Sequence, residues 1–191
     1  GILTAVYHSV IQSEEAKLSA IQEKIREGEE LLGQSSKISH EKALGIFTEL
    51  SGKETSEKLK FKIRFRLANS LEKNRDELRS LEIYKELNLS NQNTIIEDKE
   101  NLSYSIGNLL LKLNREEEGK SHLEEVLKKS QDKKIRSKAL ASIADFYFRK
   151  NDMEKARKNF ILSVQENPEN IHARIGWGKT LYNQGRDWAS Y

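Results

Sequence analysis

Residues 137–170 read SKALASIADFYFRKNDMEKARKNFILSVQENPEN, and they contain the clearest repeating pattern of the chain. In its first half, apolar and small residues recur at steps of three and four, as on one face of a helix: Leu140, Ile143, Ala144 and Tyr147. Asn151-Asp152 then interrupts the pattern, because Asn tolerates the left-handed conformation in which many helices end. The second half has Ala156, Phe160 and Ser163 on one face and stops before Pro168. The stretch therefore predicts two helices joined by a short turn.

Small residues recur along the rest of the chain in step with this unit. One series is spaced by 40, 39, 37 and 34 residues: Gly28, Ala68, Gly107, Ala144 and Gly178. A second series follows the first by 12 residues in four pairs and by 15 in the first pair: Ala43, Ser80, Gly119, Ala156 and Ser190. Such a double period predicts repeated helical hairpins in which small side chains let two helix backbones approach closely.

The unit at 137–170 resembles a tetratricopeptide repeat. That family has a period of 34 residues, small residues at positions 8 and 20, an aromatic residue near 24 and Pro at 32, which are here Ala144, Ala156, Phe160 and Pro168. The resemblance implies an all-α fold, a right-handed α-solenoid of about four and a half helix-turn-helix repeats with an N-terminal leading helix. Turn residues also recur at one place in the hairpins, at Arg75, Asn114, Asn151 and Gly185.

The repeats suggest a simple domain organisation. We expect a leading helix over 1–23 and a repeat array over 24–191. The approximate repeats are 24–60, 61–99, 100–136, 137–170 and an incomplete 171–191. Two interpretations of the leading helix stay open: a cap over the first hairpin, which repeat arrays need, or a stalk that promotes self-association.

The composition argues against a nucleic-acid-binding, disulfide-bonded or membrane-spanning chain. Lys and Arg exceed Asp and Glu by only 33 − 30 = 3, so no strong global field favours nucleic acid. There is no cysteine, which excludes disulfides and Cys-ligated zinc. The apolar opening over 1–11 is too short to span a bilayer, and it lacks a basic leader. We expect a soluble domain, with a cytoplasmic, a periplasmic and a membrane-anchored protein all left open.

The ends of the chain carry two further expectations. The chain begins with Gly1, so we expect a trimmed or processed product, and a membrane anchor upstream of residue 1 stays open. A second helix of the last hairpin should begin near Asp187, and the chain stops at Tyr191. We therefore expect the apolar face of the helix around Trp177 to lack its mate, with further chain or another protein covering it.

No catalytic, metal or cofactor site is expected. The four histidines are scattered over different repeats without a ligand or catalytic partner at helical spacing: His8, His40, His122 and His172. No Gly-rich phosphate loop follows a strand, because no strands are expected. The sequence therefore argues against an enzyme.

The resemblance implies a binding groove instead. In the family, first-helix positions 2, 5, 9 and 12 line a concave face, and aromatic, amide and charged residues occupy them here. The candidate groove residues are Phe65, Asn69, Tyr104, Asn108, Lys138, Asp145, Phe148, Lys179 and Tyr182. Such a face suits an extended peptide, with amides pairing its backbone and aromatic side chains providing contact area. The alternative is that the aromatic residues only pack against neighbouring helices.

A basic turn offers another candidate surface. It contains Lys128, Lys129, Lys133, Lys134 and Arg136. These cations would suit an acidic protein or lipid surface, or they would simply be solvated near a helix end. We therefore expect a non-enzymatic adaptor or scaffold that binds a protein or peptide in its groove. The alternative is a structural component of a larger complex, membrane-tethered or not, that forms homo-oligomers through its N-terminal helix or open last repeat.

Overall fold

The structure, a computed structural model, describes residues 1–90 and 96–189, with side chains described for 1–90 and 99–185. The described residues form nine α-helices and no strand, which confirms the predicted all-α class. The helices are α1 (Ile2–Gly33), α2 (Lys37–Ser51), α3 (Glu57–Lys73), α4 (Glu77–Ser90), α5 (Ile96–Lys112), α6 (Glu116–Lys129), α7 (Lys133–Arg149), α8 (Met153–Glu166) and α9 (Ile171–Ala189).

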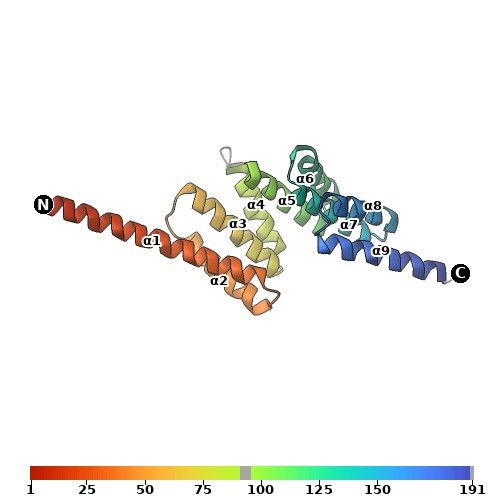
Figure 1. Ribbon diagram of the computed structural model, residues 1–191, viewed down its shortest axis with the longest axis horizontal. Helices are drawn as coiled ribbons and strands as arrows, with labels where there is room; N and C mark the ends of the chain where they lie inside the picture. The colour runs from red at the N-terminus through yellow and green to blue at the C-terminus, as the bar shows by residue number, and fades with distance from the viewer. Residues whose placement is uncertain (91–95, 190–191) are drawn as a thin grey trace. The chain divides into compact units, whose positions relative to one another are not determined.

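The chain divides into two compact units, Gly1–Leu87 and Asn88–Tyr191. In the first unit, α1 packs on α2 through its C-terminal half, and α2 packs on α3. Figure 1 shows the N-terminal half of α1 running on beyond α2. In the second unit, α5 pairs with α6 and α7 with α8, while α9 packs on α8 and α7.

Three hairpin turns share one geometry. Arg75, Asn114 and Asn151 adopt positive φ values of 66°, 59° and 61°. In each turn the next residue donates its backbone N–H to a carbonyl five residues back: Asp76 to Leu71, Arg115 to Leu110 and Asp152 to Tyr147, all at 2.9 Å. This pattern is the Schellman motif, in which a left-handed residue ends the helix and satisfies its last carbonyls. The predicted turns at these three positions are confirmed.

Small residues bring the helix backbones together, as the two series predicted. A Cβ on Gly107 would lie 3.0 Å from the carbonyl oxygen of Gly119, and the reverse distance is also 3.0 Å. In the first unit, the Ser80 hydroxyl donates to the Ala68 carbonyl oxygen at 2.8 Å. Side chains larger than these would separate the paired helices.

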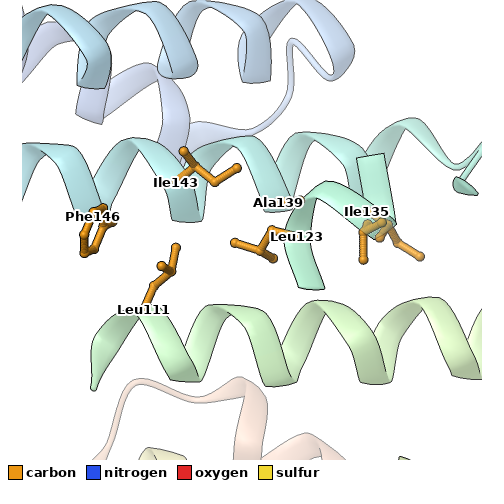
Figure 2. Packing of buried hydrophobic residues seen from close by; sticks show 7 residues of the cluster. Leu111, Leu123, Ile135, Ala139, Ile143 and Phe146 are labelled. Atoms are coloured by element: carbon orange, nitrogen blue, oxygen red, sulfur yellow. The ribbon is translucent and has the colours of Figure 1, made fainter. Parts of the chain in front are cut away.

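A buried apolar cluster joins α5, α6 and α7. Figure 2 shows Leu111 of α5, Leu123 of α6 and four residues of α7, namely Ile135, Ala139, Ile143 and Phe146. The α7 residues recur at steps of three and four, so one helix face meets both neighbours. The next cluster along the chain contains Ala144, Ala156 and Phe160, with Trp177 packed against it. These clusters hold the second unit together.

The two ends of the chain differ from the predicted hairpins. The predicted leading segment and the first helix of the first repeat form one continuous helix, α1. The turn predicted at Asn183-Gln-Gly185 is wrong, and so is the second helix predicted to begin near Asp187, because α9 continues from Ile171 to Ala189. Ser190, the last of the small-residue series, lies outside the described residues.

The predicted close contact of Gly178 is also wrong. Nothing lies within 4 Å of a Cβ built on Gly178, whereas a Cβ on Gly176 would fall 2.3 Å from the Phe160 ring. The reason is that Ala144, the equivalent residue of α7, packs on the second helix of its own hairpin. Within the described residues α9 has no such second helix, so its close contact is with α8 instead.

Candidate protein-binding face

The face predicted to line a groove is divided between the two units. Phe65 and Asn69 lie on α3 in the first unit. The remaining predicted residues lie in the second unit, on three successive first helices. They are Tyr104 and Asn108 on α5, Lys138, Asp145 and Phe148 on α7, and Lys179 and Tyr182 on α9. Because α7 packs against both α5 and α9, the second unit brings its share of the predicted residues onto neighbouring helices.

Asn108 is tied to the next first helix. The Ser142 hydroxyl of α7 donates to the Asn108 side-chain carbonyl oxygen at 2.8 Å. An amide has two donors besides this acceptor. The bond therefore orients the Asn108 side chain and occupies its acceptor oxygen.

Asp145 and His172 form a second link between first helices. The His172 Nε2 lies 2.7 Å from the Asp145 Oδ2, and about two fifths of the Asp145 side chain remains exposed. The hydrogen bond to Asp145 raises the pKa of His172, while burial, Lys179 and Lys112 oppose this shift. The His172 ring also meets the Phe160 ring edge-on, with centroids 6.5 Å apart. The imidazole thus contacts α7 and α8, while 64% of the His172 side chain remains exposed.

The other predicted residues of this unit differ in their accessibility. Lys138, Lys179 and Tyr182 are exposed, the last by 68%. Tyr104 and Phe148 are half-buried and pack against the apolar clusters of the unit. These two aromatic residues contribute to packing, as the alternative interpretation expected, whereas Tyr182 leaves most of its surface on the outside of α9.

In the first unit, Phe65 and Asn69 are engaged within the unit. The Tyr84 hydroxyl donates to the Asn69 side-chain oxygen at 3.1 Å, and the Asn69 NH₂ donates to the Phe65 carbonyl at 3.0 Å. The Phe65 ring packs against Tyr84, with centroids 5.4 Å apart. Both ends of the Asn69 amide therefore have partners inside the unit.

An ion-pair cluster lies beside these residues, between α1 and α3. Glu29 accepts from Arg66 at 2.7 Å and from Lys62 at 3.3 Å. Arg66 and Lys62 hold the pKa of Glu29 below its ordinary value, against the opposing effect of burial. The cluster thus links α1 to α3. Arg66 and Lys62 are engaged by Glu29 and are not available to a ligand in this arrangement.

The basic turn contains one residue with a structural role. Arg136 donates to Glu166 of α8 at 2.9 Å from Nε and to the carbonyl oxygens of Leu127 and Ser130 at the end of α6. Lys129 pairs with Glu125 at 2.6 Å, and Lys128, Lys133 and Lys134 are exposed. Arg136 therefore has a structural role in joining three helices, whereas Lys128, Lys133 and Lys134 are exposed on the surface.

Sequence reasoning missed the polar links between first helices. The sequence pattern showed no partner for His172 at helical spacing, because Asp145 lies 27 residues away on the preceding first helix. The bond from Ser142 to Asn108 was not predicted either. The available signal was the repeat period itself, because residues about one period apart lie on neighbouring helices.

The described residues contain no group of three or more His, Asp or Glu side chains placed to hold a metal ion. Among the described helices, none combines the length and apolar character that crossing a membrane requires.

Comparison with known proteins identifies the repeat. The tetratricopeptide-repeat family profile matches residues 137–170. The comparison with curated proteins finds no match. Among solved structures, the MamA RS-1 ArsTM double mutant is similar, with 18% identity, a TM-score of 0.54 and coverage of 84% of this chain and 85% of that chain. YrrB, described as a TPR protein with an unusual peptide-binding site, has 15% identity, a TM-score of 0.49 and coverage of 88% and 83%. Residues 137–170 are thus a tetratricopeptide repeat, within a chain whose hairpins have the tetratricopeptide-repeat fold.

Proposed function

We propose that this chain is a non-enzymatic adaptor that binds an extended segment of a partner protein across α5, α7 and α9. The tetratricopeptide repeat is a protein-interaction module, and repeat proteins of this kind are in general not enzymes. The narrower proposal concerns the face of the second unit, because its candidate residues lie on neighbouring helices of one compact unit.

The observation that carries the proposal is the exposure of α9 beside the Asp145–His172 link. Tyr182 is 68% exposed and Ile175 is 54% exposed on this helix, and Lys179 is exposed between them in sequence. Aromatic side chains contribute strongly to binding because they bury a large area at a small cost in conformational entropy. A partner segment that covers Tyr182 would gain this contact next to fixed polar groups.

The polar groups on this face would set the register of the bound segment. Asn108 and Asp145 are each held from one side, by Ser142 and His172, so their positions are fixed before a ligand arrives. Fixed donors and acceptors lower the entropic cost of binding. Because Lys138 and Lys179 lie on the same face as Asp145, we expect a partner segment of mixed polarity.

Site-specific photo-crosslinking tests this proposal without a known partner. A photo-reactive residue would replace Tyr182, and in a control chain it would replace Leu78 of α4, which is also 68% exposed. We expect partner adducts from position 182 and few from position 78. Equal labelling at both positions, or adducts only from a photo-reactive residue in place of Lys133, would contradict binding across α5, α7 and α9.

A second function, as an assembly component, is favoured by the surface of α1. Leu3 is 87% exposed and Tyr7 is 66% exposed, and Ile2, Val6 and Val10 are exposed beside them. A contiguous apolar surface of this kind marks interaction sites in folded proteins. The chain would then form homo-oligomers through the N-terminal half of α1.

Light scattering over a range of concentrations separates the two functions. For the assembly function, we expect a defined oligomer that dissociates in a Leu3→Ser, Tyr7→Ser variant. An Ile38→Ser variant is the control, because Ile38 is 65% exposed on α2 and lies away from this surface. A chain that stays monomeric at every concentration would exclude self-assembly through α1.

A further inference from the structure

A hollow in the second unit lies on a different side of α7 from the proposed binding face. It has a volume of about 320 Å³ and is lined by Leu127 of α6, Arg136 and Leu140 of α7, and Leu162, Gln165 and Glu166 of α8. Successive residues of a helix are rotated by about 100°. Arg136 and Leu140, four residues apart, therefore share a side of α7 that differs from the side of Lys138 and Asp145. The hollow, which we call the α6–α8 hollow, lies outside the predicted groove.

Three leucines form the apolar part of the hollow, and the charged residues beside them are held in place. Leu140 is buried, Leu127 is half-buried, and Leu162 is 38% exposed at the edge. Arg136 joins α6, α7 and α8 through Glu166 and the carbonyls at the end of α6. A hollow of this size is at the lower end of the range for ligand sites, which is roughly 300–1,000 Å³. It would hold one large apolar side chain without a rearrangement of the helices.

Two lysines adjoin residues that line the hollow, one in space and one in sequence. Lys133 precedes Arg136 by three residues on the same side of α7, and it lies close enough to Glu166 to help lower the pKa of that carboxyl, after the stronger effect of Arg136. Lys128 follows Leu127 directly and is exposed. Neither lysine forms an ion pair with another described residue. The Asp132 carboxylate is engaged at the start of α7, where it accepts from the backbone of Lys134 at 2.7 Å.

Local stability does not explain the position of Lys133. Lys128 and Lys129 lie in the last turn of α6, where cations are favourable toward the helix dipole. Lys133 and Lys134 lie instead in the first turn of α7, which contains no acidic residue. Cations at a helix N-terminus are unfavourable by roughly 0.3–1 kcal/mol. Local violations of this kind are expected where a sequence serves binding.

We propose that the α6–α8 hollow and Lys133 form a second docking site, which takes an acidic protein segment that inserts one large apolar side chain. Carboxylates of the segment would face Lys133 and Lys128, while its apolar side chain would contact Leu127, Leu140 and Leu162. Charge complementarity of this kind guides association, and the buried apolar contact supplies the affinity.

The shape of the site favours a protein segment over other acidic partners. Membrane surfaces are bound by apolar side chains that protrude from a helix, whereas Leu127 and Leu140 are recessed here. Single-stranded nucleic acid stacks its bases on aromatic side chains, and the lining of the hollow contains none. The exposed lysines alone could still attract acidic lipid, so the experiment includes acidic vesicles as a separate outcome.

Fluorescence anisotropy with a labelled peptide tests the site. The probe is Glu-Asp-Glu-Leu-Asp-Glu-Asp, and its control has Ser in place of Leu. We expect the intact chain to bind the probe, and Lys133→Glu to weaken binding by about tenfold or more. Glu favours a helix N-terminus, and this gain offsets the lost attraction between Lys133 and Glu166, so a melting curve of this variant accompanies the binding measurement. The matched control is Lys58→Glu, which makes the same change in the first turn of α3 and should leave binding within about twofold.

A second pair of variants tests the hollow itself. Leu162→Ser should weaken the probe to the level of the Ser peptide, while Leu78→Ser on α4 should not. Equal binding of the two peptides, an unchanged affinity in Lys133→Glu, or no binding of the probe at all would overturn the proposal. So would Lys133-dependent binding to phosphatidylserine vesicles without binding of the peptide. Photo-crosslinking at position 182 does not depend on these outcomes. Binding across α5, α7 and α9 and docking in the α6–α8 hollow can therefore be contradicted separately.

Discussion

Gly107 of α5 and Gly119 of α6 are packed so closely that a Cβ on either residue would lie 3.0 Å from the carbonyl oxygen of the other. Each added Cβ would also meet a leucine, Leu123 or Leu111, at 2.8 Å. The contact stands at the centre of the α5–α6 hairpin, next to the cluster that includes Leu111 and Leu123. Two backbones that approach this closely leave no room for a side chain between them.

Gly107→Ala should therefore destabilise the second unit. Overpacking costs about 1–3 kcal/mol, while replacing Gly by Ala within a helix recovers roughly 0.8–1.0 kcal/mol. We expect a net loss in the free energy of unfolding, measured by urea denaturation. Gly45→Ala is the matched control, because nothing lies within 4 Å of a Cβ at Gly45, which is also within a helix. The control should gain stability, and an equal gain in Gly107→Ala would contradict the close packing.

The two glycines of α9 should respond in opposite directions. A Cβ on Gly176 would enter the Phe160 ring, with ring carbons at 2.3 and 2.4 Å, whereas Gly178 faces open space. Gly176→Ala should lower the melting temperature, and Gly178→Ala should raise it slightly through helix propensity. If Gly178→Ala lowered the melting temperature more than Gly176→Ala, Gly178 would be the closely packed residue, as the repeat spacing predicted.

Gly176 and Gly178 show which contacts the repeat spacing could not predict. The repeat spacing predicted hairpins and the turns at Arg75, Asn114 and Asn151, because a helix end requires a specific backbone geometry that few residues adopt. It failed at Gly185, where turn-type residues continue a helix. A period also places Gly178 opposite a second helix without showing whether one is there. The repeat period thus predicted a turn even at Arg75, but which surface covers a residue depends on the chain around it.

The candidate site was less predictable than the fold. Repeat positions placed Asn69, Asn108 and Asp145 at one register, yet each has a different kind of partner: Tyr84, Ser142 and His172. The repeat position determines on which face of the helix a side chain lies. Its hydrogen bonds depend on neighbours one period away, whose identities differ from repeat to repeat.

Arg75→Gly should stabilise the first unit. Arg75 has a φ of 66°, where a Cβ is strained by about 1–2 kcal/mol. Asn114 and Asn151 tolerate the same geometry better. We expect a gain of up to about 1 kcal/mol in urea denaturation for Arg75→Gly, and a smaller gain for Asn151→Gly. A loss of stability in Arg75→Gly would mean that the side chain makes a contact that outweighs the strain.

Arg136→Ala should destabilise the second unit by about 1–3 kcal/mol, because Glu166 and two carbonyls of the α6 end lose their donor. Arg136→Lys should rescue this loss only in part, since one ammonium does not reproduce the planar fork of donors. Lys128→Ala, a neighbouring exposed cation, should change stability by less than about 0.5 kcal/mol. Full rescue by Lys would show that charge alone matters at position 136.

The link between Asp145 and His172 should make the docking of α9 depend on pH. The hydrogen bond to Asp145 raises the pKa of His172 above 6.5, its ordinary value, despite opposition from burial, Lys179 and Lys112. Protons therefore bind the folded state more tightly than the unfolded state. The stabilisation is fully present below pH 6.5 and is lost as the pH rises through the raised pKa of His172.

In Asp145→Asn we expect the histidine to titrate closer to 6.5 by NMR. The difference in unfolding free energy between natural chain and variant should be larger at about pH 5.5 than at about pH 8.5. An unchanged His172 titration in Asp145→Asn would show that the two side chains do not interact in solution.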